Sequence, residues 1–333
     1  MQFDQLKRRE FITFLGAAAP WPLTAHAQQP ERTRRIGVLM AHAESDPEGQ
    51  AFVAAFREVL QKLGWVEGRN IRIDTRWAAE VELMPGFAKE LIALQPDLIL
   101  ANNTPTTAAV LQQTTTIPIV FAVVADPVGS GFVASLARPG GNVTGFTLTE
   151  PTMTSKWLEL LKEIAPHVSR VAFLFNPATT PYRDIYLNPF KAAAPNFGVQ
   201  AIPTPVHGAS ELEPDIAAQA REPNSGLIVM PDGFMNVHRA EITSLADRYR
   251  LPAVYPFRFF AELGGLLCYG NEQRDQFRLA ATYVDRVLRG GKPSDLPVQA
   301  PVRFELVINL KTAKALGLDV PAQLQQRADE VIE

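Results

Sequence analysis

The chain is poor in cysteine: Cys268 is the only one among 333 residues, so no intramolecular disulfide can form. Cys268 lies in the apolar run Leu266–Tyr269, where a single thiol is far more often core filler than a nucleophile. The chain also lacks a G-x-S-x-G elbow, an H-E-x-x-H motif and any cysteine cluster. We therefore predict no enzyme activity, no catalytic residue, no metal site and no cofactor.

A large excess of charge is absent as well. The formal net charge is −3, and without its first 27 residues the chain carries 29 basic and 33 acidic residues. Such a chain is a poor partner for nucleic acid or an anionic membrane. The remaining 306 residues exceed the usual size of a single core, and 47% of the whole chain is hydrophobic. Two globular domains are expected.

Long apolar runs are missing too. The stretch Phe11–Ala19 is too short to cross a membrane, which needs about 20 residues. It follows Lys7-Arg8-Arg9 and precedes the small-x-small site Ala25-His26-Ala27, an arrangement typical of a cleavable export signal. We predict that residues 1–27 are removed, that the protein is periplasmic, and that no stable membrane insertion follows. The paired arginines favour the twin-arginine route, with the Sec route left open.

Beyond the signal, strand-like and helix-like patterns alternate in two series. The first series comprises a strand at Arg35–Ala41, a helix at 52–63, a strand at Ile71–Trp77, a helix at Leu83–Leu94, a strand at Asp97–Ala101, a helix opening at Thr104-Pro105, and a strand at Ile117–Val124. The second comprises a strand at Arg170–Phe175, a helix near Tyr182–Phe197, a strand at Val199–Thr204, a helix at Glu211–Ala220, a strand at Gly226–Met230, a helix at Val237–Tyr249, and a strand at Ala253–Tyr255.

The two series echo each other in detail. The segment Pro96–Ala101 parallels Asn224–Val229, and Ile117–Phe121 parallels Leu251–Tyr255. Apolar strands separated by amphipathic helices predict two open parallel sheets, each covered on both faces. Ligands bind beyond the carboxyl ends of such strands, so both sheets are expected to face one cleft.

Several motifs resemble one known family, namely Asp126–Gly131, Arg138–Gly145, Leu158–Glu163, Gly264-Gly265-Leu266, Tyr269-Gly270 and Phe304–Asn309. On these motifs the mature chain resembles the periplasmic substrate-binding proteins of ABC transporters with the type I binding-protein fold, specifically the TrpX-like branch. The resemblance implies a monomeric receptor that closes on a small molecule and delivers it to the transmembrane subunits of an ABC permease.

The same resemblance implies an α/β fold of two Rossmann-like, doubly wound parallel-sheet domains joined by a three-segment hinge. The crossings are expected near Phe146–Pro151, Gly270–Glu272 and Pro297–Arg303. The helix Gln276–Leu288 would return to the first domain, and the strand Phe304–Asn309 to the second. The expected limits are 28–148 plus 271–298 for the first domain and 149–270 plus 299–333 for the second.

One glycine motif favours a different class of protein. Gly129–Ala134 fits the G-x-G-x-x-A dinucleotide fingerprint, which keeps a NAD-dependent oxidoreductase as an alternative. Its position is wrong, however, because it follows the fourth strand rather than the first. We expect Gly129 and Gly131 to permit a turn that starts a helix at Phe132–Leu136. A sensory ligand-binding subunit is a third possibility that the sequence leaves open.

Polar residues at the predicted strand ends are the candidate binding groups. Thr104 can cap a helix whose first position suits Pro105, and the free N–H groups there can hold a carboxylate. Asp126 and Asp232 follow strands of the two series, and each either pairs with an ammonium group or caps the next helix. His42 also falls at a strand end, where it either lines the cleft or is solvated.

Aromatic residues gather at the same edges and form either a flat-walled pocket or interdomain packing. They are Phe146, Phe234, Tyr255, Phe257 and Tyr269. An anion site, carboxylates and aromatic walls together favour an apolar or aromatic amino acid as the ligand. The full predicted ligand-binding set is His42, Asn103, Thr104, Thr106, Asp126, Thr147, Asn176, Asp232, Tyr255 and Tyr269.

Overall fold

A computed structural model describes residues 32–333, so the predicted export signal at residues 1–27 lies outside the described residues. Five parallel strands form the first sheet, in the order β2-β1-β3-β4-β5. They are β1 (Arg34–Met40), β2 (Ile71–Trp77), β3 (Leu98–Asn103), β4 (Ile119–Val124) and β5 (Val143–Thr147). Every residue of β4 and β5 is buried, which accounts for the near-continuous apolar sequence of β4.

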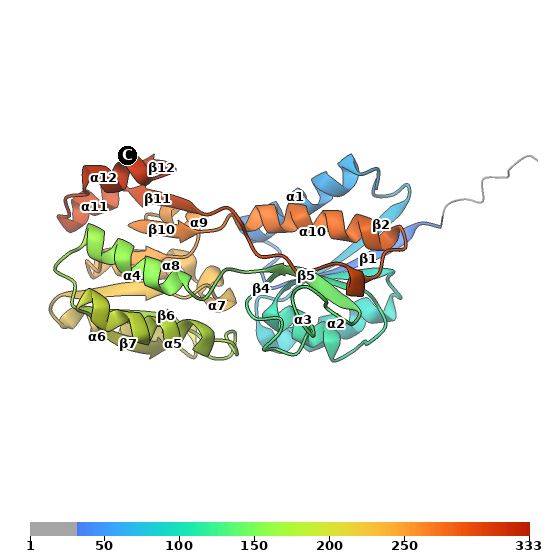
Figure 1. Cartoon of the computed structure of the whole chain (residues 1–333), viewed down its shortest axis with the longest axis horizontal. Helices are drawn as coiled ribbons and strands as arrows, with labels where there is room; N and C mark the ends of the chain where they lie inside the picture. Colours follow the sequence, from blue (N-terminus) through green and yellow to red (C-terminus); the bar gives the residue numbers. More distant parts are fainter. Residues whose placement is uncertain (1–31) are drawn as a thin grey trace, which may run out of the picture. The chain divides into compact units, whose positions relative to one another are not determined.

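Helices cover both faces of the first sheet (Figure 1). They are α1 (Pro47–Lys62) and α10 (Gln273–Leu288) on one face, and α2 (Met84–Ala93) and α3 (Thr104–Leu111) on the other, with the short turns η1 (Val81–Leu83) and η3 (Pro293–Asp295). Helices α1 and α10 lie side by side, and the Phe52 and Phe277 rings stack with centroids 5.0 Å apart. Helix α10 therefore packs on the first sheet although it follows the second sheet's strands in the chain.

Seven strands form the second sheet, in the order β12-β11-β10-β9-β8-β6-β7. They are β6 (Arg170–Phe175), β7 (Gln200–Pro205), β8 (Ser225–Val229), β9 (Ala253–Tyr255), β10 (Leu267–Gly270), β11 (Glu305–Asn309) and β12 (Glu330–Ile332). Its helices are α4 (Met153–Ile164), α5 (Asp184–Ala193), η2 (Ala194–Phe197), α6 (Ala209–Arg221), α7 (Gly233–Val237), α8 (Arg239–Arg248), α9 (Arg258–Glu262), α11 (Leu310–Leu316) and α12 (Ala322–Arg327).

Two strands at one edge of the second sheet depart from the predicted parallel arrangement. Strand β11 runs antiparallel to β10, and β12 is parallel to β11, so both run opposite to the other five strands. Strand β11 enters this sheet from the first one after η3, without the crossover helix that a parallel neighbour needs. With this exception, the two helix-covered sheets confirm the predicted α/β class with two parallel-sheet domains.

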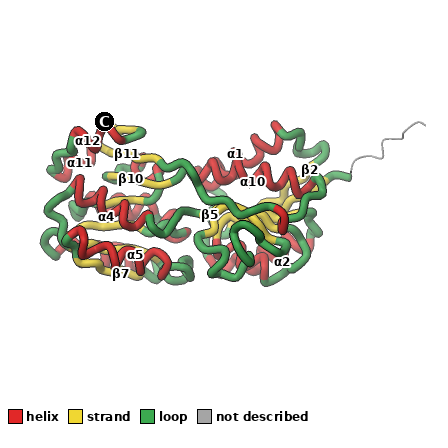
Figure 2. The backbone as a smooth tube through the Cα atoms, in the orientation of Figure 1, coloured by secondary structure: helices red, strands yellow, loops and turns green. Residues whose placement is uncertain are grey.

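Three segments connect the two sheets. They run from β5 to α4, from β10 to α10, and from η3 to β11 (green loops in Figure 2). The first and third lie against each other, since the Thr147 N–H donates to the Gln299 carbonyl at 2.8 Å. The exact domain limits given above stay a prediction. Within residues 32–333, no helix combines the length and the apolar character needed to span a membrane.

Some predicted elements were wrong. Phe132–Leu136 forms no helix, because the N–H groups of Phe132 and Val133 donate to the Pro127 carbonyl and Ala134 donates to Pro139. These bonds close a turn instead of continuing as a ladder. By contrast, the predicted helix 237–249 is confirmed as α8, which begins two residues later because His238 is its N-cap. The strand expected at 97–101 continues to Asn103, and the prediction from the sequence missed β5, β10 and β12 altogether.

Candidate ligand-binding site

A cavity of about 550 Å³ lies at the carboxyl ends of β3 and β4 and is also lined by the loop between β6 and α5. Its volume falls within the usual range of small-molecule sites. It thus draws residues from both sheets. The lining residues are Val81, Met84, Pro85, Thr104, Pro105, Ala108, Ala109, Gln112, Asp126, Gly129, Ser130 and Phe132 from the first half, and Ala178, Pro181, Tyr182, Asp184 and Ile185 from the second.

The walls of this cavity are mainly apolar and carry negative charge. Among the described lining residues, the charged side chains are Asp126 and Asp184, and no lysine, arginine or histidine is present. The Tyr182 hydroxyl donates to the Pro231 carbonyl at 3.0 Å, so its ring is held by its own half. Burial, the largest cause, and then the Asp232 charge raise the pKa of Tyr182 well above its usual value. The site therefore favours a ligand with an apolar body and a cationic group.

Asp126 is held in place by a close turn. Its Oδ1 accepts a hydrogen bond from the Gly129 N–H at 2.7 Å, and the residue is half-buried. A Cβ atom at position 129 would lie 1.9 Å from Asp126 Oδ2, so a larger residue there would displace the carboxylate from this position. Within residues 32–333 the structure gives Oδ2 no hydrogen-bond donor. Gly129 therefore holds the Asp126 carboxylate in position. The dinucleotide-binding alternative requires a helix after the glycines, and residues 132–136 form none.

The start of α3 differs from the prediction, because Asn103 and not Thr104 is the N-cap. Asn103 Oδ1 accepts from the Thr106 N–H at 3.2 Å, and Thr106 Oγ1 accepts from the Asn103 N–H at 2.8 Å, a reciprocal capping box. Pro105 has no N–H, so the helix start offers few free donors to an anion. The buried Thr104 Oγ1 accepts from the Ala125 N–H at 3.2 Å, which leaves its hydroxyl proton available to the cavity.

Asp232 has a different environment from Asp126. It is 2% exposed, and it caps α7 by accepting from the Phe234 N–H at 2.7 Å. It also accepts from the Asn176 N–H at 2.7 Å and from the Thr179 hydroxyl. Burial raises the pKa of Asp232 to about 6, although these hydrogen bonds oppose the rise. Of the two roles left open by the sequence, the structure supplies the cap.

A second cavity beside Asp232 is too small for an amino acid. Its volume is about 20 Å³, enough for roughly one water molecule. His42, Asn103 and Asp232 line it. His42 is 4% exposed and its Nδ1 lies 3.0 Å from Asp46 Oδ2, so this ring is neither solvated nor directed into the larger cavity.

The other predicted residues line neither of these two cavities. Asn176 Oδ1 accepts from the Ala178 N–H at 2.8 Å within its own turn. Thr147 is buried at the first crossing. Tyr255 stacks on Phe260 at 4.9 Å, and Tyr269 lies 6.2 Å from Phe304. These aromatic rings belong to the faces of β9 and β10, so they pack within the second half.

The cavity's aromatic walls come from residues that the sequence reading missed. Phe132 and Tyr182 are the lining rings, and Met84 and Pro181 add apolar surface. Tyr182 follows β6 by a loop that begins at Asn176, the carboxyl end of the first strand in the second series. The carboxyl end of β6 was the signal that could have indicated Tyr182, but the predicted ligand-binding set included only Asn176 from this loop.

Comparison with known proteins agrees with this fold. Residues 38–332 match the model of the family described as ABC transporter substrate binding protein. A tyrosine-binding protein of Clostridioides difficile strain R20291 is 26% identical over 291 residues, which cover 86% of this chain and 82% of the relative.

Two solved structures show the fold. The ABC domain in complex with L-Trp from Streptococcus pneumonia is similar with a TM-score of 0.83 and 24% identity, covering 90% of this chain and 100% of that one. The ligand-free, open structure of a substrate binding protein with adhesive properties from Clostridium difficile gives a TM-score of 0.66 and 25% identity, covering 90% and 99%. Because the family model spans most of its length, this chain belongs to the ABC transporter substrate binding protein family and has the type I periplasmic binding protein fold that its motifs resemble.

Proposed function

We propose that this protein is the receptor of an ABC importer and that it binds an aromatic or other apolar amino acid in the 550 Å³ cavity. The observation that carries the proposal is the cavity itself, which combines apolar walls from both halves with the Asp126 carboxylate. The relatives add support, since one is named for binding tyrosine and another was solved with L-Trp.

The two ends of an amino acid have separate partners in this proposal. Asp126 Oδ2 accepts from the ligand ammonium, and its position is fixed by the bond from Gly129 to Oδ1. The Thr104 hydroxyl donates to the ligand carboxylate, because its oxygen already accepts from Ala125. The apolar side chain lies against Phe132 and Tyr182, whose rings favour offset or edge contacts with another ring.

Binding is coupled to closure of the two halves about the three connecting segments. The cavity takes its walls from both halves, so a bound ligand gains its full set of contacts only when the halves are together. Small-angle scattering checks this coupling, since saturating ligand should reduce the radius of gyration. We further propose that residues 1–27 direct the protein to the periplasm and are cleaved there, and that the permease's transmembrane subunits receive the ligand.

Calorimetric titration with L-tyrosine, L-tryptophan, L-phenylalanine and L-leucine tests the ligand class. We expect at least one of the aromatic amino acids to bind, and we expect tryptamine to bind better than indole-3-propionate, since the cavity wall carries carboxylates. Native mass spectrometry of freshly purified protein weighs any ligand that co-purifies. A co-purified ligand that is neither an amino acid nor an amine, with no binding of the panel, would refute the proposal.

A further inference from the structure

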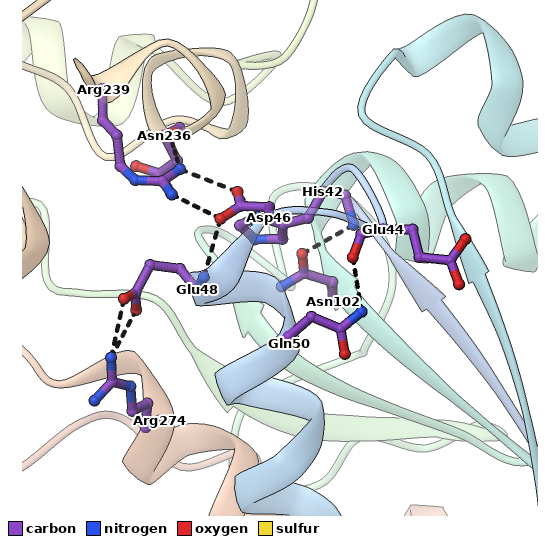
Figure 3. A network of polar contacts seen from close by, with 10 residues as sticks. His42, Glu44, Asp46, Glu48, Gln50, Asn102, Asn236, Arg239 and Arg274 are labelled. Carbon is purple, nitrogen blue, oxygen red and sulfur yellow. Dashed lines mark hydrogen bonds and ion pairs between the residues drawn. The ribbon is translucent and has the colours of Figure 1, made fainter.

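An ion pair joins the two halves of the molecule away from the candidate cavity. Asp46 lies before α1 of the first sheet, and Arg239 begins α8 of the second. Arg239 Nη2 donates to Asp46 Oδ1 at 2.6 Å and Nη1 donates to Oδ2 at 3.0 Å, a bidentate arrangement (Figure 3). The side chains are 9% and 14% exposed, so water screens this pair little.

Asp46 is oriented by its own half of the protein. It is the N-cap of α1, since its Oδ1 accepts from the Glu48 N–H at 2.9 Å, and its Oδ2 lies 3.0 Å from His42 Nδ1. Burial raises the pKa of Asp46, but the hydrogen bonds from His42 and Arg239 outweigh burial and hold the pKa well below its usual value. The carboxylate is therefore ionised in the pair, and its contacts with His42 and the Glu48 N–H orient it from the first half.

Arg239 is oriented by the second half in the same way. Its Nη1 also donates to the Asn236 carbonyl at 2.7 Å, and its guanidinium lies 5.5 Å from the centroid of the Phe259 ring. Both partners are thus held in place by contacts within their own halves, which reduces the entropy lost when they meet. Bidentate geometry and these added hydrogen bonds offset the desolvation that makes many buried pairs unfavourable.

We propose that the Asp46–Arg239 pair is a latch that holds the two halves closed and thereby raises affinity for the ligand in the separate 550 Å³ cavity. The proposal rests on the receptor function above. Neither residue lines that cavity, so any effect on affinity must act through the closed state. Opening about the connecting segments separates α1 from α8 and breaks both hydrogen bonds of the latch.

A double-mutant cycle on the latch tests its effect on affinity. Asp46→Asn keeps a good N-cap for α1 while removing the charge, and Arg239→Gln removes the partner. With L-tyrosine and L-tryptophan as the titrated probes, we expect each single variant to weaken binding by about tenfold or more. The double variant should be no weaker than either single one, because the same contact is lost only once. Additive losses, or no loss, would overturn the latch.

The chain offers a matched control in the same network. Arg274 Nη2 donates to both oxygens of Glu48 at 3.0 Å, but this pair joins α1 to α10, which already pack together on the first sheet (Figure 3). Glu48→Gln with Arg274→Gln therefore removes a charge pair of the same kind without releasing the second half. We expect probe affinity within about twofold of the parent. A tenfold loss of probe affinity in this control would show that losing any charge pair near α1 weakens binding, and would contradict a specific role for the latch.

A measurement without ligand separates the latch from the proposed function. Spin labels at Ala54→Cys on α1 and Ser244→Cys on α8 report the distance between the halves, both sites being exposed and Cys268 being buried. We expect Asp46→Asn and Arg239→Gln to shift the ligand-free distances to larger values, and the Glu48/Arg274 control to leave them unchanged. Unchanged distances in the latch variants would refute the latch even where amino acids bind. Failure of every amino acid to bind, with the shift present, would refute the ligand class alone.

Discussion

Asp126 and Asp232 both lie beyond the carboxyl end of a strand, one in each half, yet the structure gives them different surroundings. Each follows a strand of its sheet near the carboxyl end, β4 in one case and β8 in the other. Asp126 is half-buried on the cavity wall with Oδ2 directed to no described donor. Asp232 is 2% exposed, and three protein donors point at its two oxygens.

The difference shows how aspartates at the carboxyl ends of strands in two similar sheets take two different roles. Gly129 supplies one donor to Asp126, and a larger residue there would displace the carboxylate, so this glycine leaves the second oxygen in place for a ligand. The loop that starts at Asn176 folds back over Asp232 and closes it off. The first half therefore brings charge to the cavity, while the second half brings apolar surface through Tyr182 and its neighbours.

The largest expected effect is on stability and belongs to Asp232. Asp232→Ala leaves the N–H groups of Asn176 and Phe234 without their acceptor and the Thr179 hydroxyl with only its longer bond to the Asn176 carbonyl at 3.3 Å. At about 1–3 kcal/mol for each unsatisfied group, we expect a loss of roughly 3–5 kcal/mol in the free energy of unfolding. Asp126→Ala, which frees one exposed N–H, should cost less than about 1 kcal/mol. Urea unfolding of both variants measures the contrast, and equal losses would break the comparison.

The pH dependence of stability should also distinguish Asp232. Its pKa rises from 3.8 to about 6 on folding, so between these values the folded state binds more protons than the unfolded one. Its contribution to stability is therefore fully present below about pH 4 and is lost as pH rises through 6, by about 3 kcal/mol at most. Asp232→Asn does not titrate. The stability of the parent minus that of this variant should fall from pH 4 to pH 7, and a flat difference would contradict the assignment.

Asp126 should have the next largest effect, on affinity. Asp126→Asn removes the charge that faces the ligand ammonium, and a charge-assisted hydrogen bond is worth roughly 1.5–3 kcal/mol. We expect L-tyrosine or L-tryptophan to bind about tenfold to a hundredfold more weakly, and their deaminated analogues to change little. Asp184→Asn is the matched control, because its exposed carboxylate lines the same cavity from the first turn of α5. Equal losses of affinity in the two variants would mean that the ligand responds only to the overall negative charge of the cavity, with no specific contact at Asp126.

Periodicity and composition predicted most of the fold. Apolar runs such as 117–124 and amphipathic spacing such as 52–63 report burial directly, so β4 and α1 followed from the sequence. Strand β5 was missed because its five residues include Thr144 and Gly145 and lack a long apolar run. The helix at 132–136 failed because the Pro127 carbonyl takes two N–H groups there, a local hydrogen-bonding choice that spacing does not reveal.

The candidate site was only partly predictable, for a related reason. Strand ends indicate which residues reach the cleft, and this brought Thr104 and Asp126 to the cavity. Whether such a side chain is free to bind a ligand depends on hydrogen-bond donors from other segments. Asp232 shows this, because the Asn176 N–H and the Thr179 hydroxyl occupy its carboxylate. Tyr255 was placed by its position near a strand end, but its ring stacks on Phe260 because it lies within β9, not beyond it. Such outcomes require the packed structure.

The smallest expected effect tests whether the second half contributes shape alone. Tyr182 lines the cavity with its ring, while its hydroxyl donates to Pro231 at 3.0 Å within the second half. Tyr182→Phe should cost about 1 kcal/mol of stability, because one buried acceptor loses its donor, and leave amino-acid affinity within about twofold. Tyr182→Ala removes the wall itself and should weaken binding by about tenfold or more. Calorimetric titration of the two variants separates the contribution of the Tyr182 ring to affinity from that of its hydroxyl. A large loss of affinity in Tyr182→Phe would mean that the second half also recognises a polar group of the ligand, and the division between charge and shape would have to be redrawn.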